Sequence, residues 1–106
     1  MKKIVIQEMA DLIKNYWSPL DLFQIDNIKV RLVKLKGKYH WHKHTEEDEI
    51  FYVISGTMKI HFRDKIVSLN PNETILVPKN MEHLTESKEG AIVMLIEPAE
   101  IKTSGD

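Results

Sequence analysis

The sequence has no cysteine among its 106 residues. Without thiols the chain forms no disulfide bonds, offers no thiolate ligand to a metal and supports no thiol catalysis. The absence also agrees with a cytoplasmic location, because structural disulfides belong mainly to secreted proteins. A metal site in this chain therefore has to rely on nitrogen and oxygen ligands.

Long apolar runs are also missing. The apolar residues Ile4, Val5 and Ile6 are followed by Gln7 and Glu8, so this run is far shorter than the ~7–15 apolar residues of a secretory signal. No stretch approaches the ~20 apolar residues that a membrane-spanning helix requires. We therefore expect a cytoplasmic protein with no membrane partner and no cleaved leader.

Neither sign of charge dominates. The 15 basic and 16 acidic residues give a formal net charge of -1, which is no electrostatic reason to expect a nucleic acid or a membrane surface as a partner. Hydrophobic residues make up 42% of the chain and charged residues 29%, as in ordinary globular proteins. The length and the lack of repeats or linkers predict one domain.

The spacing of apolar residues divides the chain into a short helical segment and a series of strands. Residues 7–16 carry apolar side chains at helical spacing, and Ser18 and Pro19 end that pattern. Beyond it the spacing changes to period two, with Gly, Pro and Asn turns between the runs. Strands are expected at residues 28–36, 50–54, 58–63, 66–69, 74–77 and 91–97. This pattern predicts an all-β protein, here a small β-barrel.

The predicted barrel occupies residues 27–98. Residues 99–106 show no apolar pattern and are expected to form a loose tail, whereas residues 1–26 form a helix and an extended segment. That segment is rich in large apolar side chains: Tyr16, Trp17, Leu20, Leu22 and Phe23. A single small barrel leaves sheet edges and apolar surface to cover. We therefore expect a homodimer that pairs through this segment, with packing of the segment over its own barrel as the alternative.

Three histidines stand at alternate positions before the strand predicted at residues 50–54. On an extended chain, residues two apart point to the same face roughly 6.6 Å apart, so His40, His42 and His44 share a face. Carboxylates follow at Glu46, Glu47, Asp48 and Glu49, and a further histidine occurs at His83. Imidazole and carboxylate suit first-row metals such as Zn, Fe, Ni and Mn. Spacing alone leaves two other interpretations open: an exposed strand face, and a mixed-charge loop that titrates near neutral pH.

Two spaced motifs resemble those of the cupins. The first reads Gly37-x4-His42-x-His44-x4-Glu49-x6-Gly56, and the second reads Asn72-x5-Pro78-x-Asn80-x2-His83-x3-Ser87. The resemblance covers residues 28–98 and is to small single-domain bacterial cupins. The first gap is one residue shorter than usual, Ser87 stands in place of Asn, and Asn72 and Asn80 stand in place of Gly. Asparagine tolerates positive φ better than other non-glycine residues, so we expect both turns to survive.

The resemblance implies a jelly-roll β-barrel that holds one divalent metal ion, Fe, Mn, Ni or Zn, in its interior. Its ligands would be His42, His44 and Glu49 from the first motif and His83 from the second. Apolar residues near the ion would form a pocket wall, with plain core packing as the alternative. These candidates are Phe51, Val53, Met58, Ile60 and Phe62.

Other polar residues near the motifs have different expected roles. His40 lies outside the first motif and would stand at the rim of the site or behind its ligands. His61 alternates with core-facing residues, so we expect it to face solvent. The acids Glu46, Glu47 and Asp48 would form a solvated approach loop, because only Glu49 has the motif spacing. No residue stands out as a general base.

The number of positions that the metal keeps open would decide its chemistry. Four protein ligands complete a tetrahedral structural site, whereas an octahedral ion keeps about two positions for substrate. A fold alone does not choose between enzymes and binding proteins. We favour a small metal-dependent enzyme, either an oxygenase or a sugar-type isomerase or epimerase acting on an oxygen-rich small molecule. The alternatives are a non-catalytic metal or small-molecule binding or sensor cupin, and a purely structural barrel.

Overall fold

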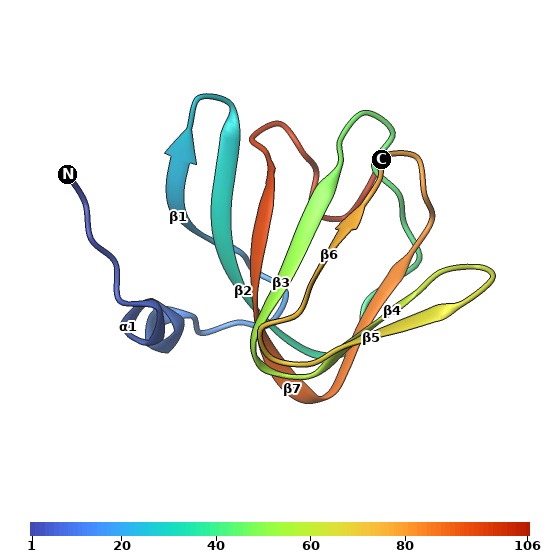
Figure 1. Cartoon of the computed structure of the whole chain (residues 1–106), viewed down its shortest axis with the longest axis horizontal. Helices are drawn as coiled ribbons and strands as arrows, with labels where there is room; N and C mark the ends of the chain where they lie inside the picture. Colours follow the sequence, from blue (N-terminus) through green and yellow to red (C-terminus); the bar gives the residue numbers. More distant parts are fainter.

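One helix and seven strands make up the fold of the computed structural model, which describes all 106 residues (Figure 1). The strands join in one antiparallel sheet of order β1-β2-β7-β3-β6, with β4 paired to β7 and β5 paired to β4. The elements are α1 (Ile6–Leu12), β1 (Leu20–Ile25), β2 (Ile28–Lys38), β3 (Glu49–Gly56), β4 (Met58–His61), β5 (Ile66–Leu69), β6 (Thr74–Val77) and β7 (Leu84–Pro98). The predicted all-β jelly-roll fold with a short N-terminal helix is confirmed.

The longest strand, β7, is the centre of the sheet. It pairs with β2 along one edge, and with β3 and β4 along the other. Val93 of β7 lies opposite both Val33 of β2 and Val53 of β3, and all three side chains are buried. They belong to the main core cluster, which also contains Leu35, Phe51, Met58, Ile60, Phe62, Leu69, Val77, Ala91 and Leu95. Each fully buried Val, Leu or Ile side chain contributes about 1.5–3 kcal/mol by leaving water.

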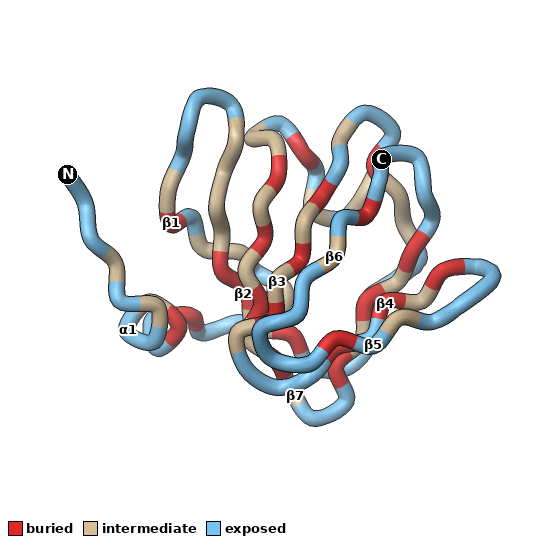
Figure 2. Tube along the Cα trace, viewed as in Figure 1, coloured by how far each residue is buried: buried red, intermediate tan, exposed pale blue.

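A second cluster of buried residues lies where the N-terminal segment meets the sheet (Figure 2). Ala10 and Ile13 pack there with Leu22 of β1 and Leu32 of β2. The N-terminal segment therefore packs on its own sheet. The helix is shorter than predicted, because the chain is already extended at Ile13. With seven residues, it is neither long nor apolar enough to cross a membrane.

Strand β1 was not predicted from the apolar pattern. It pairs with β2 at the edge of the sheet, and a shift in register between Asp21 and Phe23 interrupts its pairing. Such a bulge puts one extra residue into the strand and breaks the period-two alternation that the prediction requires. Strand β7 likewise begins at Leu84, earlier than predicted. Its first part carries the buried polar residues Thr85 and Ser87, so apolar spacing did not indicate a strand there.

His61 differs from its expected exposure. Its Nε2 lies 2.7 Å from Oε1 of Glu86 on the neighbouring strand β7, and only 20% of each side chain is exposed. The ring therefore packs along the sheet surface against a carboxylate instead of extending into solvent. Period-two spacing assigned the correct outer face, but it could not reveal the cross-strand partner.

The two asparagines that replace family glycines adopt the expected backbone conformation. Asn72 has a φ of 69° and Asn80 a φ of 64°, both in the left-handed region. The Asn72 side chain also accepts a 2.8 Å hydrogen bond from the Tyr52 hydroxyl, which ties this turn to β3. Both turns therefore survive the replacement of glycine, as predicted.

Two glycines of the first motif provide a matched test of backbone crowding. Gly56 and Gly37 have φ values of 76° and 85°, but a Cβ on Gly56 would overlap the carbonyl oxygen of Gly90, whereas a Cβ on Gly37 would have no neighbour within 4 Å. We expect Gly56→Ala to lower the free energy of unfolding by roughly 3 kcal/mol or more, and Gly37→Ala by about 1–2 kcal/mol. Urea denaturation measures both losses. Equal losses would contradict the importance of this close approach.

Candidate metal centre

The two motifs meet through main-chain pairing of His42 with His83. The N–H of His42 donates to the carbonyl of His83 at 3.0 Å, and the N–H of His83 donates to the carbonyl of His42 at 2.9 Å. This bridge joins the loop that leads from β2 to β3 with the residue before β7. It brings the two imidazole rings to a centroid distance of 4.4 Å. His44 follows on the same face, and Glu49 is the first residue of β3.

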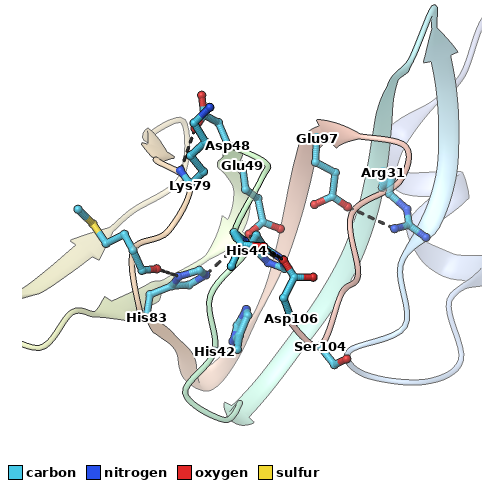
Figure 3. Close-up of polar contacts among 12 residues, drawn as sticks. Arg31, His42, His44, Asp48, Glu49, Lys79, His83, Glu97, Ser104 and Asp106 are labelled. Atoms are coloured by element: carbon cyan, nitrogen blue, oxygen red, sulfur yellow. Dashed lines mark hydrogen bonds and ion pairs between the residues drawn. The ribbon is translucent and has the colours of Figure 1, made fainter.

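Four potential ligands converge near this bridge (Figure 3). One ring nitrogen from each of His42, His44 and His83 lies within 4.8 Å of the others. Oε1 of Glu49 is 3.5 Å from Nε2 of His44 and 3.8 Å from Nε2 of His83. These separations are too long for good hydrogen bonds. The structure thus brings together all four residues that the motifs indicate as ligands.

Three of the converging atoms are buried without a hydrogen-bond partner. They are Nε2 of His44, Nε2 of His83 and Oε1 of Glu49, and the three residues are only 3%, 1% and 6% exposed. An unsatisfied buried polar group costs about 1–3 kcal/mol, and most such groups in native proteins have partners. A shared divalent cation would satisfy all three atoms at once. The donor set therefore fits a metal of the nitrogen- and oxygen-binding class.

The opposite nitrogens of two rings are held by main-chain carbonyls. Nδ1 of His83 is 2.9 Å from the carbonyl oxygen of Met81, and Nδ1 of His42 is 3.0 Å from that of His40. Because a carbonyl oxygen only accepts hydrogen bonds, each Nδ1 carries the proton and each Nε2 keeps a free lone pair. Such partners orient histidine ligands and fix their tautomer in metalloproteins.

The protonation states also suit a metal site. Burial lowers the pKa of His42 to about 4, against a smaller opposing effect of the hydrogen bond to His40, so the ring is neutral at pH 7. Burial alone would raise the pKa of Glu49, but its interactions with His44, His83 and Glu97 outweigh burial and hold the pKa well below its usual range. A neutral imidazole and an ionised carboxylate are the forms that bind metals.

The motifs did not indicate a second buried carboxyl group, that of Glu97. Its Oε1 accepts a 3.2 Å hydrogen bond from Arg31, while its buried Oε2 has no partner. Burial and the nearby charge of Glu49 raise the pKa of Glu97. The available signal was its position two residues after Leu95, which places it on the inward face directly after the apolar stretch of residues 91–96.

A cavity of about 40 Å³ opens beside His42 and Glu49. Of the predicted pocket residues, only Phe51 lines it. Val53, Met58 and Ile60 pack in the core instead, as does Phe62, whose ring lies 6.5 Å from that of His83. The remaining wall comes from residues that the motifs do not include: Trp17, Pro19, Val33, Leu35, Tyr39, Thr85, Leu95 and Thr103.

Residues 99–106 lie against the loop that carries His42 and His44, although we expected a loose tail. Oδ2 of Asp106 accepts hydrogen bonds from the N–H and the hydroxyl of Thr45, both at 2.7 Å. The exposed His40 ring bonds to the carbonyl oxygen of Ser104 at 2.8 Å, and Ile101 is buried. Gly105 passes so close that an added Cβ would lie 2.6 Å from Cβ of His42. These polar contacts have no apolar pattern from which to predict them.

The acids between His44 and Glu49 stay outside the ligand set. Glu46 and Asp48 are exposed and Glu47 is half-buried. Oδ1 of Asp48 accepts a 2.8 Å hydrogen bond from the N–H of Lys79, which ties the loop to the second motif. Glu49 alone points to the histidines (Figure 3).

Known proteins resemble this chain in both sequence and structure. Residues 31–97 match the cupin domain family. The Bacillus subtilis (strain 168) protein YdbB is 30% identical over 96 residues, which cover 90% of this chain and 85% of that protein. A cupin-2 domain containing protein from Shewanella frigidimarina NCIMB 400 is 36% identical with a TM-score of 0.88, over 90% of this chain and 93% of that one. Protein NMB1881 from Neisseria meningitidis is 31% identical with a TM-score of 0.84, over 92% and 99% of the two chains.

The lowered pKa of His42 predicts that the metal-free protein loses stability on acidification. The unfolded chain binds a proton at His42 near pH 6.5 and the folded chain only near pH 4. The stabilisation is therefore complete above pH 6.5 and is lost as the pH falls towards 4. We expect the urea midpoint to fall more between pH 7 and pH 5 in the wild type than in His42→Gln, which cannot titrate. Parallel declines in the two proteins would contradict this assignment.

Proposed function

Because the chain belongs to the cupin superfamily as a small single-domain member, we propose that it is a metal-dependent enzyme acting on an oxygen-containing small molecule. The metal would be one divalent ion per chain, held by His42, His44, Glu49 and His83. The observation that carries this proposal is the convergence of three buried, unpartnered ligand atoms at one point of the barrel. A metal ion offsets the free-energy cost of burying them.

The ion, Fe, Mn, Ni or Zn, would supply Lewis acidity or, if redox-active, activation of oxygen. The chain's own residues would position the substrate and keep water out. Phe51 and Leu95 contribute apolar walls beside Glu49, and Thr85 contributes a hydroxyl group. Burial raises the pKa of Tyr39, and the charge of Glu49 raises it further, so the phenol keeps its proton at neutral pH. Tyr39 would therefore donate a hydrogen bond to substrate and would not serve as a base.

The cavity favours an enzyme over a structural barrel. A purely structural site has no use for open space beside its ligands, whereas the cavity here reaches both His42 and Glu49. The reaction would be an oxygenation or a sugar-type isomerisation or epimerisation, since both require substrate oxygen atoms at the metal. A non-catalytic binding or sensor protein would use the same geometry without turnover. Oxygen-uptake and isomerase assays of the metal-loaded protein distinguish these cases.

Metal analysis tests the proposed site. We expect about one Fe, Mn, Ni or Zn ion per chain in untagged protein, and less than about 0.1 per chain in a His44→Ala/His83→Ala variant, because that variant removes half of the ligands. Plasma mass spectrometry measures both contents. His61→Ala is the control, since His61 pairs with Glu86 away from the ligands, and it should keep its metal. A wild type that binds no metal even after reconstitution would refute the proposal.

We also propose that two copies associate through the N-terminal segment in the cytoplasm. Apolar side chains remain exposed there, among them Leu12 at 62%, Tyr16 at 53% and Ile25 at 66%. A second copy would remove them from water. Analytical ultracentrifugation at micromolar concentration should show a dimer, and Leu12→Glu should weaken it. A wild-type monomer would exclude the dimer, and cell fractionation tests the location.

A further inference from the structure

The wall of the cavity beside the metal centre combines ligand and aromatic side chains. His42, Glu49 and Phe51 line it. Trp17 and Tyr39 line it as well, and their rings stack with a centroid distance of 4.9 Å and an interplanar angle of 24°. The Tyr39 ring also lies edge to face with that of His42, at a centroid distance of 5.4 Å. A molecule in this cavity would therefore meet both ligand atoms and aromatic side chains.

The cavity wall has no cationic side chain. Glu49 is the only charged residue among those that line it, and the others are apolar, aromatic, hydroxyl-bearing or neutral imidazole. The nearby Arg31 is held elsewhere, by Asp21 at 2.7 Å and by Glu97 at 3.2 Å. A phosphate or a carboxylate placed away from the metal would thus be buried without a partner, which is strongly unfavourable.

Trp17 is held at the cavity by an unusual backbone conformation. Its φ is 64°, in a region that bulky residues rarely adopt. Two hydrogen bonds to β2 fix it there: its main-chain N–H donates to the carbonyl of Lys34 at 2.9 Å, and its indole N–H donates to that of Lys36 at 3.2 Å. Strained residues of this kind persist where the surrounding structure holds them, and they cluster at functional sites.

We propose that the cavity binds a small oxygen-bearing molecule with an uncharged, flat, apolar body. The oxygen would face the metal centre, and the body would pack against the aromatic side chains of Trp17 and Phe51. This inference rests on the proposed function and narrows its substrate class. It disfavours sugar phosphates and substrates with a second anionic group.

Two probes that differ by one charge test the substrate class. Catechol carries adjacent hydroxyl groups on a neutral ring, and 3,4-dihydroxybenzoate adds a carboxylate. Isothermal titration of the metal-loaded protein should show catechol binding at least about tenfold more tightly. Trp17→Ala should weaken catechol binding about tenfold, because it removes the aromatic wall. Its metal content after the titration should still equal that of the wild type.

The two tryptophans of the chain provide a matched optical control. Trp41 is exposed and lies against Arg63, 3.8 Å from ring centroid to guanidinium carbon, and it does not line the cavity. In Trp41→Phe the only indole is that of Trp17, so catechol should change the fluorescence. In Trp17→Phe, which keeps an aromatic ring and guards against misfolding, catechol should leave the fluorescence of Trp41 unchanged.

The outcomes separate this inference from the proposed function. Equal or tighter binding of the carboxylate probe to metal-loaded protein would overturn the inference alone, as would unchanged catechol affinity in Trp17→Ala. A metal-loaded wild type that binds neither probe would also overturn it. A wild type that takes up no metal would overturn the proposed function and this inference together.

Discussion

The pairing of His42 with His83 is the contact on which the rest of the site depends. Two main-chain hydrogen bonds join the two motifs at this point, and they do so whatever the side chains bind. The rings are thereby placed before any metal arrives. The same bridge connects the loop between β2 and β3 with the residue that precedes β7. This one interaction therefore links the fold to the site.

A polar centre inside an apolar barrel needs compensation. The row of valines across β2, β7 and β3 packs in the main core cluster and holds these strands together. At the centre itself, the three ligand atoms, Nδ1 of His44 and Oε2 of Glu97 are buried without partners. Arg31 offsets part of the cost at Glu97 from the side of the sheet. The ion that the ligands fit would offset the cost at the three ligand atoms, which would link metal binding to stability.

The sequence predicted those features that depend on periodic or motif spacing. Alternating apolar residues indicated the strands, and the two motifs indicated the residues that the fold brings together. Asn72 and Asn80 were predicted to keep their turns because asparagine tolerates positive φ, and both do. These features are local, so a short stretch of sequence contains their cause.

The features that escaped prediction depend on tertiary contacts. Strand β1 was hidden by a bulge next to Asp21. Trp17 lines the cavity with its backbone in the left-handed region, a conformation that the adjacent residues in the sequence do not predict. Glu97 has no motif spacing, and only the fold shows that its side chain is buried. Asp106 is held by hydrogen bonds from Thr45, which is far away in the sequence. Each of these placements is decided by a partner far along the chain.

X-ray absorption spectroscopy of the metal-loaded protein tests the central claim most directly, because imidazole ligands give a characteristic scattering pattern at the metal edge. The account predicts about three imidazoles and at least one oxygen ligand in the wild type, and one imidazole fewer in His44→Ala. A spectrum dominated by oxygen ligands, or one that His44→Ala leaves unchanged, would contradict a metal centre formed by His42, His44, Glu49 and His83.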